Sequence, residues 1–311
     1  MLRFDFASDF SEGLAAVRQG DRYAYIDRSG QEVIAVDSSF DGVSAFSEGR
    51  ALVRVNDVCG YIDRLGTIVI PPQFPGANSF ANGLAAVRTG NRYGYINLSG
   101  EMAIEPQYTL TSDFAEGVAA VKLDDRYGYI DPQGKWVIAA QYEDAWSFSE
   151  SRAVVRVNGQ SCYIDRSSAI VIPSAFDGAF SFSEQLGRIR KGSIWGFVDE
   201  GGTEVIVPQF DFASDFSEGL AAVLVGSQWG YIDPQGKMAI APQFNFASNF
   251  SAGLAAVTLN GKIGYIDRSG AMAIAPQFAQ AGSFAEGFAW VQLESNWYFI
   301  DSEGRFLGQG A

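Results

Sequence analysis

The sequence contains no histidine, which removes the commonest metal ligand and the commonest general base at neutral pH. It has 22 Lys and Arg residues against 36 Asp and Glu residues, a formal net charge of −14. A nucleic-acid binder normally presents a basic surface, so this balance argues against DNA or RNA as the main partner. No apolar stretch approaches the roughly 18 residues that a membrane span requires. We therefore predict no metal, no cofactor, no nucleic-acid partner and no membrane span.

The sequence repeats one motif nine times. An aromatic residue opens each unit, with a step of 34 residues throughout except for 36 in the first. The units begin near Phe4, Phe40, Phe74, Tyr108, Tyr142, Phe176, Phe210, Phe244 and Phe278. No linker or low-complexity tract interrupts them. A fixed period is the signature of a repeat architecture, so we predict a single array over residues 1–311.

The residue pattern of each unit predicts three short strands. Residues 14–18 alternate small or β-branched side chains with variable ones, as a half-buried strand does. A turn such as Gly20-Asp21 then predicts a hairpin. In the next strand the column of Tyr25 is aromatic in all nine units, and a glycine such as Gly94 often follows the first aromatic residue. Glycine inside a strand indicates that another backbone or ring packs very close.

An Asp-x-x-Gly turn, as in Asp27 to Gly30, precedes the third strand. Consecutive apolar residues such as Val137-Ile138 indicate a strand buried on both faces, so each sheet should be packed between its neighbours. The unit closes with an aromatic residue and the spacing Phe210, Ala213, Phe216. This spacing predicts a 3₁₀ turn or a compact aromatic contact between units.

The only two cysteines, Cys59 and Cys162, lie three repeats apart in different columns. Stacked sheets are about 10 Å apart, whereas a disulfide needs Cα atoms within about 7 Å. We therefore expect two free thiols, which suits a reducing compartment. Residues 1–3 run straight into the first repeat without a visible signal peptide, so we expect a cytoplasmic protein.

The repeated pattern Glu-Gly-Leu-Ala-x-Val, Trp/Tyr-Gly-Tyr-Ile-Asp and Gly-x-x-Val-Ile-x-Pro-Gln-Phe resembles the bacterial WG repeat family, of which the KWG repeat is a close relative. The resemblance covers essentially the whole chain. The naming dipeptide survives literally at Trp195-Gly196 and Trp229-Gly230. The resemblance implies a β-rich repeat protein, and it carries no catalytic residues to this sequence.

Two all-β architectures satisfy this pattern. Three-stranded meanders could stack as an open superhelix or solenoid, or they could close into a propeller-like toroid. Propellers typically have about four to eight blades of four strands, which nine units of three strands fit poorly. The last unit is also degenerate, with Gly308 at the core Ile position and Tyr298 at the strand Gly position. Open arrays need atypical ends as caps, so we favour the open form.

Two acidic columns could carry chemistry. Asp or Asn follows the second strand in every unit, and Glu precedes the first strand in seven units. Turn formation explains the Asp column, since Asn97 fills the role equally well. The alternatives are cation binding by the Asp column and a hydrolase built on paired carboxylates. Every unit offers the same two residues and none is singled out, so we predict no catalytic residue.

A basic column runs through the first six units, and the sixth unit adds further positive charges. Two interpretations stay open: solvated side chains paired with the acidic columns, or a stripe that meets an acidic partner surface. The candidate partner-binding residues are Arg18, Arg54, Arg88, Lys122, Arg156, Arg188, Arg190 and Lys191. Exposed aromatic side chains at Trp146, Phe180, Trp290 and Trp297 are further candidates, although packing between units explains them equally well.

These observations predict a non-enzymatic protein-binding or scaffolding protein that presents an extended β surface to a protein partner. The main alternative is a carbohydrate or cell-envelope binding module that uses the aromatic columns for stacking. A carboxylate-pair hydrolase is a more remote alternative.

Overall fold

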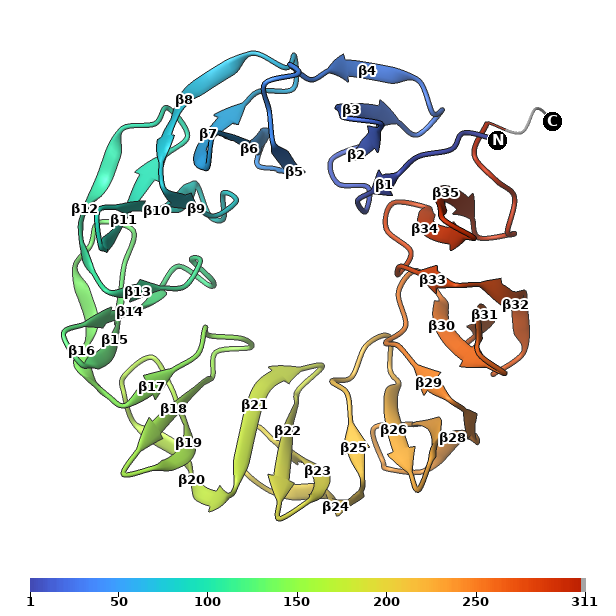
Figure 1. Ribbon diagram of the computed structural model, residues 1–311. Helices are drawn as coiled ribbons and strands as arrows, with labels where there is room; N and C mark the ends of the chain where they lie inside the picture. The colour runs from blue at the N-terminus through green and yellow to red at the C-terminus, as the bar shows by residue number, and fades with distance from the viewer. Residues whose placement is uncertain (309–311) are drawn as a thin grey trace. The chain divides into compact units, whose positions relative to one another are not determined.

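The computed structural model describes residues 1–308, apart from the side chains of residues 174 and 175. These residues form nine small antiparallel sheets, which we number as modules 1 to 9 in chain order (Figure 1). Modules 1 to 8 each contain four strands in sequence order, and module 9 contributes three. The chain divides into two compact units, one of residues 1–57, 61–68 and 216–311 and one of residues 58–60 and 69–215.

Four classes of strand recur. The first strands are β1 (Phe6–Ala7), β5 (Gly42–Ser47), β9 (Gly76–Ala77), β13 (Leu110–Thr111), β17 (Asp144–Ala145), β21 (Gly178–Ser183), β25 (Phe212–Ala213), β29 (Phe246–Ala247) and β33 (Gln280–Ala281). The second strands are β2 (Leu14–Gln19), β6 (Arg50–Val55), β10 (Leu84–Thr89), β14 (Ala119–Leu123), β18 (Ala153–Val157), β22 (Leu186–Lys191), β26 (Ala221–Val225), β30 (Leu254–Leu259) and β34 (Phe288–Leu293).

The third strands are β3 (Arg22–Asp27), β7 (Val58–Ile62), β11 (Arg92–Asn97), β15 (Arg126–Ile130), β19 (Gln160–Ile164), β23 (Ile194–Asp199), β27 (Gln228–Ile232), β31 (Lys262–Asp267) and β35 (Asn296–Asp301). The fourth strands are β4 (Glu32–Ala35), β8 (Ile68–Phe74), β12 (Met102–Tyr108), β16 (Trp136–Tyr142), β20 (Ile170–Phe176), β24 (Glu204–Phe210), β28 (Met238–Phe244) and β32 (Met272–Phe278).

The prediction of three strands per unit is wrong, because the first strand was missed. The segment expected to form a 3₁₀ turn or an aromatic contact instead contains a short strand, as in β29, where Phe246 pairs with Thr258 and Ala247 with Val257. A strand of two residues is too short to show a period of two in the sequence. The other three strands of each module agree with the predicted meander.

The turns explain both acidic columns. Glu12 and Gly13 have φ angles of 53° and 80°, and the backbone groups of Ser11 and Leu14 bond to each other across them. This is a two-residue hairpin turn with two left-handed residues. At the Asp-x-x-Gly turn, Oδ1 of Asp27 accepts hydrogen bonds from the backbone N–H groups of Ser29 and Gln31. The prediction that the Asp column forms turns is confirmed, and the side chain of Asn97 makes the same bonds.

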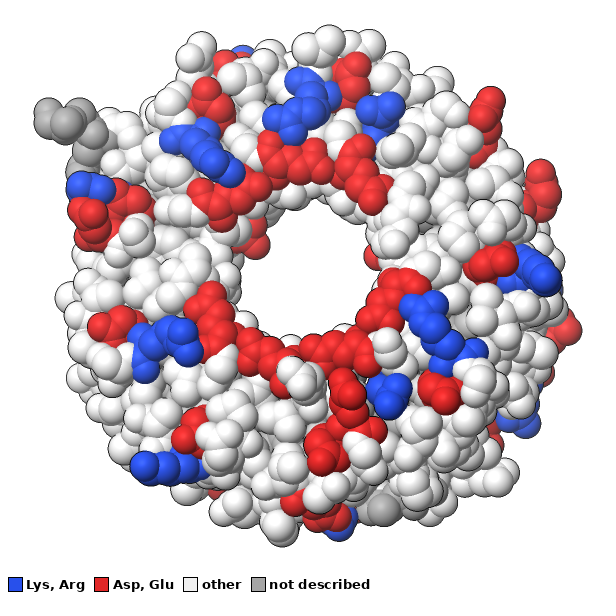
Figure 2. All heavy atoms as spheres, turned by 180° about the vertical axis from the view of Figure 1, so that it is seen from behind, with Lys and Arg blue, Asp and Glu red and all other residues white. Residues whose placement is uncertain are grey.

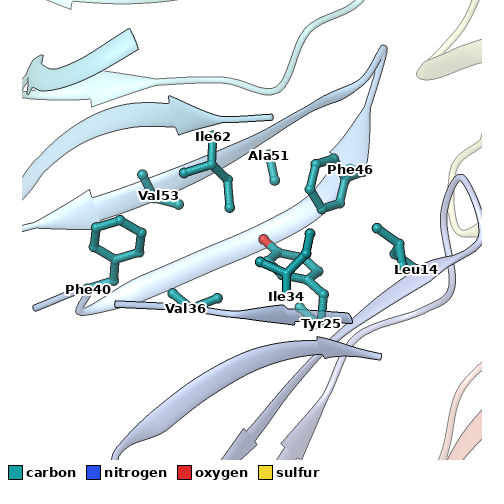
Figure 3. Close-up of a cluster of buried hydrophobic side chains, with 10 residues drawn as sticks. Leu14, Tyr25, Ile34, Val36, Phe40, Phe46, Ala51, Val53 and Ile62 are labelled. Carbon is teal, nitrogen blue, oxygen red and sulfur yellow. The ribbon is translucent and has the colours of Figure 1, made fainter. Parts of the chain in front are cut away.

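Within each compact unit, clusters of buried hydrophobic side chains lie between neighbouring modules. One face of module 1 presents Leu14, Tyr25 and Ile34, which pack against Phe46 and Val53 of module 2 (Figure 3). The opposite face of module 1 packs against module 9. Module 1 is therefore covered on both faces. The prediction that the consecutive apolar residues of the fourth strand are buried on both faces is wrong, because Ile34 and Ile138 are buried whereas Val33 is 47% exposed and Val137 is 43% exposed.

A buried tyrosine joins one module to the next. The hydroxyl of Tyr25 donates a hydrogen bond of 2.7 Å to the carbonyl of Ser44 in the first strand of module 2. The same bond, at 2.7 to 2.8 Å, recurs between the pairs Tyr95–Ser112, Tyr129–Trp146, Tyr163–Phe180, Tyr231–Ser248 and Tyr265–Gly282. Burial raises the pKa of all six phenols above its usual value. We call this contact the tyrosine bond.

The strand glycines mark close backbone contacts, as predicted. A Cβ added at Gly94 would lie 2.4 Å from the carbonyl oxygen of Ile104 and 2.8 Å from the nitrogen of Pro106 in the fourth strand. The fourth strand is bulged at this point. Equivalent contacts of 2.3 to 2.5 Å occur at Gly60, Gly128, Gly196, Gly230 and Gly264.

The first and last modules are neighbours, so the favoured prediction of an open array with free ends is wrong. Phe4 pairs with Trp297 of β35 through backbone hydrogen bonds of 3.0 and 2.8 Å. Phe4 thus takes the place that the last aromatic residue of a fourth strand holds in other modules, such as Phe244 opposite Trp229. The closed, propeller-like alternative fits this contact and the four-stranded modules. In Figure 1 the N-terminal segment lies beside the last strands.

The degenerate last unit is completed by the N-terminal segment and is not a cap. A Cβ on Gly308 would lie 2.9 Å from the side chain of Leu2, so glycine leaves room for that leucine. Leu2 in turn packs on Gly30, as the core Ile of a preceding module packs on the equivalent glycine at Gly100. We call residues 2–4 the N-terminal latch.

Candidate binding surfaces

Each module has two ends with different chemistry. The glutamate end carries the Glu-Gly turn and the Asp-x-x-Gly turn, because the start of the second strand pairs with the end of the third. The hairpin end carries the turn between the second and third strands, and it also carries the start of the first strand, since Phe6 pairs with Arg18. The predicted basic column lies at the hairpin end.

At the glutamate end, side chains of the Glu column accept backbone hydrogen bonds from the next module. Glu12 accepts a hydrogen bond from the backbone N–H of Gly49 at 3.1 Å, and Glu286 accepts one from Gly13 at 2.8 Å. The same bond joins Glu116 to Ser151, Glu150 to Gln185 and Glu218 to Gly253, at 2.7 to 3.1 Å. This contact accounts for a Glu column without a catalytic role, and it offsets the strain of a left-handed glutamate.

Arginine side chains form ion pairs with glutamates at this end. Arg28 pairs with Glu286 at 2.7 Å and Arg64 with Glu12 at 3.4 Å, and the hydrogen bond from Arg28 lowers the pKa of Glu286. Figure 2 shows a face of the molecule on which Asp and Glu side chains gather with Lys and Arg beside several of them. A shallow pocket of about 490 Å³ lies beside Gly13 and Asp27. Among the described residues, no three Asp, Glu or Cys side chains are grouped so that they could hold a metal ion.

At the hairpin end, the basic column contacts its own sheet. The guanidinium of Arg18 lies 5.9 Å from the ring of Tyr23, and the ammonium of Lys122 lies 5.4 Å from that of Tyr127. Arg88 donates a hydrogen bond to the carbonyl of Pro75 at 3.1 Å. Arg54 and Arg156 are exposed. The structure places these five candidates at equivalent positions of successive second strands.

The three candidates of the sixth unit differ from one another. Arg188 is 13% exposed and forms an ion pair with Asp215. Arg190 donates to the carbonyls of Gly192 and Asp177 at its own hairpin. Lys191 pairs with Glu204. They do not form one cluster, because Arg188 points between sheets while Arg190 and Lys191 lie at the hairpin end.

Large apolar side chains are exposed on the first strands, and sequence reasoning missed most of them. Phe6 is 37% exposed, Leu110 is 47% exposed and Phe246 is 51% exposed, while Trp146, which was among the candidates, is 42% exposed. Their signal is an aromatic or Leu residue two positions after the unit-opening aromatic, as in Phe4-x-Phe6. It went unused because no strand was expected there.

The exposed rings contact tryptophan rings of a neighbouring module in tilted orientations. Phe246 lies 5.4 Å from Trp229, and Phe6 lies 6.2 Å from Trp297, measured between ring centroids. Trp290 and Trp297 lie 4.7 Å apart. Both cysteines are buried thiols that form no disulfide, as predicted, and burial raises the pKa of the Cys162 thiol.

The sequence profile of the WG containing repeat matches the chain nine times: at residues 2–23, 23–59, 60–93, 93–127, 127–160, 163–193, 195–228, 229–262 and 263–297. The four-stranded modules and these matches define a β-repeat protein. The chain belongs to the WG-repeat family. No curated protein matches it in sequence.

Solved structures resemble the fold at low sequence identity. A crystal structure of the eukaryotic initiation factor aligns over 86% of this chain and 86% of its own, with 13% identity and a TM-score of 0.62. Hsv2 of Kluyvelomyces marxianus aligns over 78% of this chain and 98% of its own, with 7% identity and a TM-score of 0.47. Likeness at such identity concerns the fold alone. Among the described residues, no helix is long and apolar enough to cross a membrane.

Proposed function

We propose that this WG-repeat protein is a non-enzymatic protein-binding scaffold whose hairpin end and first strands form the binding surface. The observation that carries the proposal is the exposure of Phe6, Leu110 and Phe246 on first strands. Phe6 and Phe246 lie in one compact unit and Leu110 lies in the other. Aromatic and Arg side chains are enriched at protein interfaces, so each unit offers side chains of the kind that bind partners.

The predicted basic column supports the same surface. Phe6 is the cross-strand neighbour of Arg18, and Leu110 is that of Lys122. An exposed apolar side chain and a positively charged side chain thus lie side by side in each of the two compact units. A partner with an apolar patch and nearby carboxylates would match both features.

The glutamate end supports no enzymatic proposal, because its Glu and Asp columns hold turns and join modules. We keep the prediction that the chain is not an enzyme. We also keep the cytoplasm as the proposed compartment, because neither thiol forms a disulfide and disulfides are rare in reducing compartments.

A capture experiment with matched variants tests the surface. The double variant Phe6→Ser with Phe246→Ser removes two exposed first-strand rings. We expect any specific partner recovered by the unaltered protein to bind at least about tenfold more weakly to this variant, since removal of an aromatic anchor typically costs 1 kcal/mol or more.

The control is Val33→Ser with Met272→Ser, which removes exposed apolar groups of the fourth strands, 47% and 39% exposed. It should bind every recovered partner normally. Equal binding by both double variants would refute the proposed surface.

Carbohydrate binding is the second candidate, and the paired aromatic rings of Trp229–Phe246 and Trp297–Phe6 favour it. Rings of this kind can serve as stacking platforms for sugars. Specific hits on a glycan array that disappear in the Phe6→Ser, Phe246→Ser variant, with no protein partner recovered, would support this alternative against the first.

A further inference from the structure

Two modules lack the tyrosine bond because their third strands carry Phe197 and Phe299 in place of tyrosine. In both, the cross-strand neighbour is also unusual: Arg188 pairs with Phe197, and Trp290 pairs with Phe299. At this second-strand position the other modules carry a shorter apolar residue: Ala16, Leu52, Ala86, Ala120, Val154, Ala222 and Ala256. The loss of the hydroxyl therefore coincides with the gain of a long N–H donor beside it.

Arg188 fills an aromatic cage. Its guanidinium carbon lies 4.4 Å from the ring centroid of Phe180, 4.9 Å from that of Trp195 and 5.6 Å from that of Phe212. These rings also contact one another, with centroid distances of 5.0 Å for Phe180–Trp195 and 4.9 Å for Trp195–Phe212. A planar cation stacked on such rings is attracted by their negative faces.

The polar contacts of Arg188 reach the next first strand. Nη1 donates a hydrogen bond of 2.6 Å to the carbonyl of Ala213 in β25, and Nε forms an ion pair of 3.0 Å with Oδ1 of Asp215. Ala213 directly precedes the residue whose equivalents, such as Ser44 and Ser112, accept the tyrosine bond. The guanidinium thus supplies a donor to this strand where phenylalanine cannot.

The pair of Trp290 and Phe299 shows the same replacement of a tyrosine hydroxyl by a side-chain N–H donor. Trp290, the neighbour of Phe299, donates a side-chain hydrogen bond to Asp9, which occupies the position in module 1 that Asp215 occupies in module 7. Glycine at position 282 leaves room for this indole, because a Cβ there would lie 2.4 Å from its nitrogen. Both phenylalanine modules therefore use an N–H donor and an Asp in place of the hydroxyl.

We propose that Phe180, Trp195, Phe212 and Asp215 form a guanidinium-binding site, and that Arg188 is its built-in ligand, which replaces the tyrosine bond at this junction. The site favours a guanidinium because three rings lie within 4.4 to 5.6 Å of its carbon, a carbonyl accepts a hydrogen bond from Nη1 and a carboxylate balances its charge. Arg188 is thereby committed to the fold. Arg190 and Lys191 remain the candidates of this module for contact with a partner.

The test is chemical rescue. Arg188→Ala empties the cage and leaves Asp215 without its cation, so we expect the melting temperature to fall by roughly 5 °C. Methylguanidinium at tens of millimolar should raise the melting temperature of this variant by roughly 2 °C or more relative to its effect on the unaltered protein. The matched control is Arg190→Ala, whose guanidinium donates to the backbone carbonyls of Gly192 and Asp177 in its own module. It should show no such rescue.

A double variant tests whether Arg188 replaces the tyrosine bond. Adding Phe197→Tyr to Arg188→Ala restores the residue pair of the other modules, and we expect it to recover at least half of the lost melting temperature. Equal methylguanidinium effects on Arg188→Ala and Arg190→Ala, or no recovery in the double variant, would overturn the proposal. If Arg188→Ala does not fold, Arg188→Lys and Arg190→Lys decide: a loss confined to Arg188→Lys supports the site, and equal melting temperatures refute it.

Discussion

Substituting Ala for Gly94 is expected to lower the free energy of unfolding by about 3 kcal/mol. The added methyl group would meet backbone atoms of Ile104 and Pro106 at 2.4 and 2.8 Å, and a backbone cannot rotate away as a side chain can. The bulged fourth strand would have to move off the sheet. Chemical denaturation followed by circular dichroism measures the loss.

The matched control is Gly76→Ala in the first strand of the same module. Its added Cβ would meet only the side chain of Arg88, at 3.5 Å or more, and its φ angle is not positive. We expect a change below about 1 kcal/mol. If Gly94→Ala is as stable as Gly76→Ala, the close contact that the structure shows is wrong.

Three modules replace this glycine: module 9 carries Tyr298 and has only three strands of its own, and modules 1 and 5 show how a four-stranded module accommodates a larger residue. Ala24 stands in this column in module 1, where the fourth strand ends early at Ala35 and two extra residues follow before the next unit. Cys162 stands there in module 5, and a pocket of about 150 Å³ lies beside it. In both cases space near the fourth strand accompanies the larger side chain, as the contact at Gly94 requires.

The second large effect concerns the N-terminal latch. The double variant Leu2→Ala with Phe4→Ala should lose about 5 kcal/mol, because it removes the side chains that fill the outer strand of module 9. It should also expose the backbone amide of Trp297, which now bonds to Phe4. Denaturation and hydrogen exchange at this amide measure the two results.

Arg3→Ala is the control for the latch, because Arg3 lies between the two altered residues and is exposed. It should retain both the stability and the protected Trp297 amide. If the double variant behaves like Arg3→Ala, the first and last modules do not depend on this segment.

Residue types that recur at the same position of successive repeats predict most of the fold. Alternation in residues 14–18, the turn at Gly20 and the apolar pairs of the fourth strands predict three of the four strands, and the strand glycines predict the close contact. These signals are local, since turn chemistry and strand period depend on residues near one another in the chain.

The features that could not be predicted from the sequence depend on contacts between distant residues or on very short strands. The first strand has two residues in modules such as module 8, so no alternation marks it. The contact of Phe4 with Trp297 joins opposite ends of the chain. The role of Arg188 required knowing that Asp215 and three rings surround it. The candidate surface likewise became visible only once the exposure of Phe246 was known.

Tyrosines buried between modules join neighbouring sheets, and spectrophotometric titration at alkaline pH tests this most directly. The six tyrosines of the tyrosine bond have a raised pKa in the folded state, so they stabilise the fold below the pKa of an unfolded tyrosine, about 10, and this stability is lost as pH rises further. Burial also raises the pKa of Tyr108, Tyr127 and Tyr142. We predict that fewer than half of the 13 tyrosines ionise reversibly near pH 10 while the β spectrum persists, and that the six of the tyrosine bond ionise only as that spectrum is lost. Reversible ionisation of all 13 near pH 10 with an unchanged β spectrum would contradict the account.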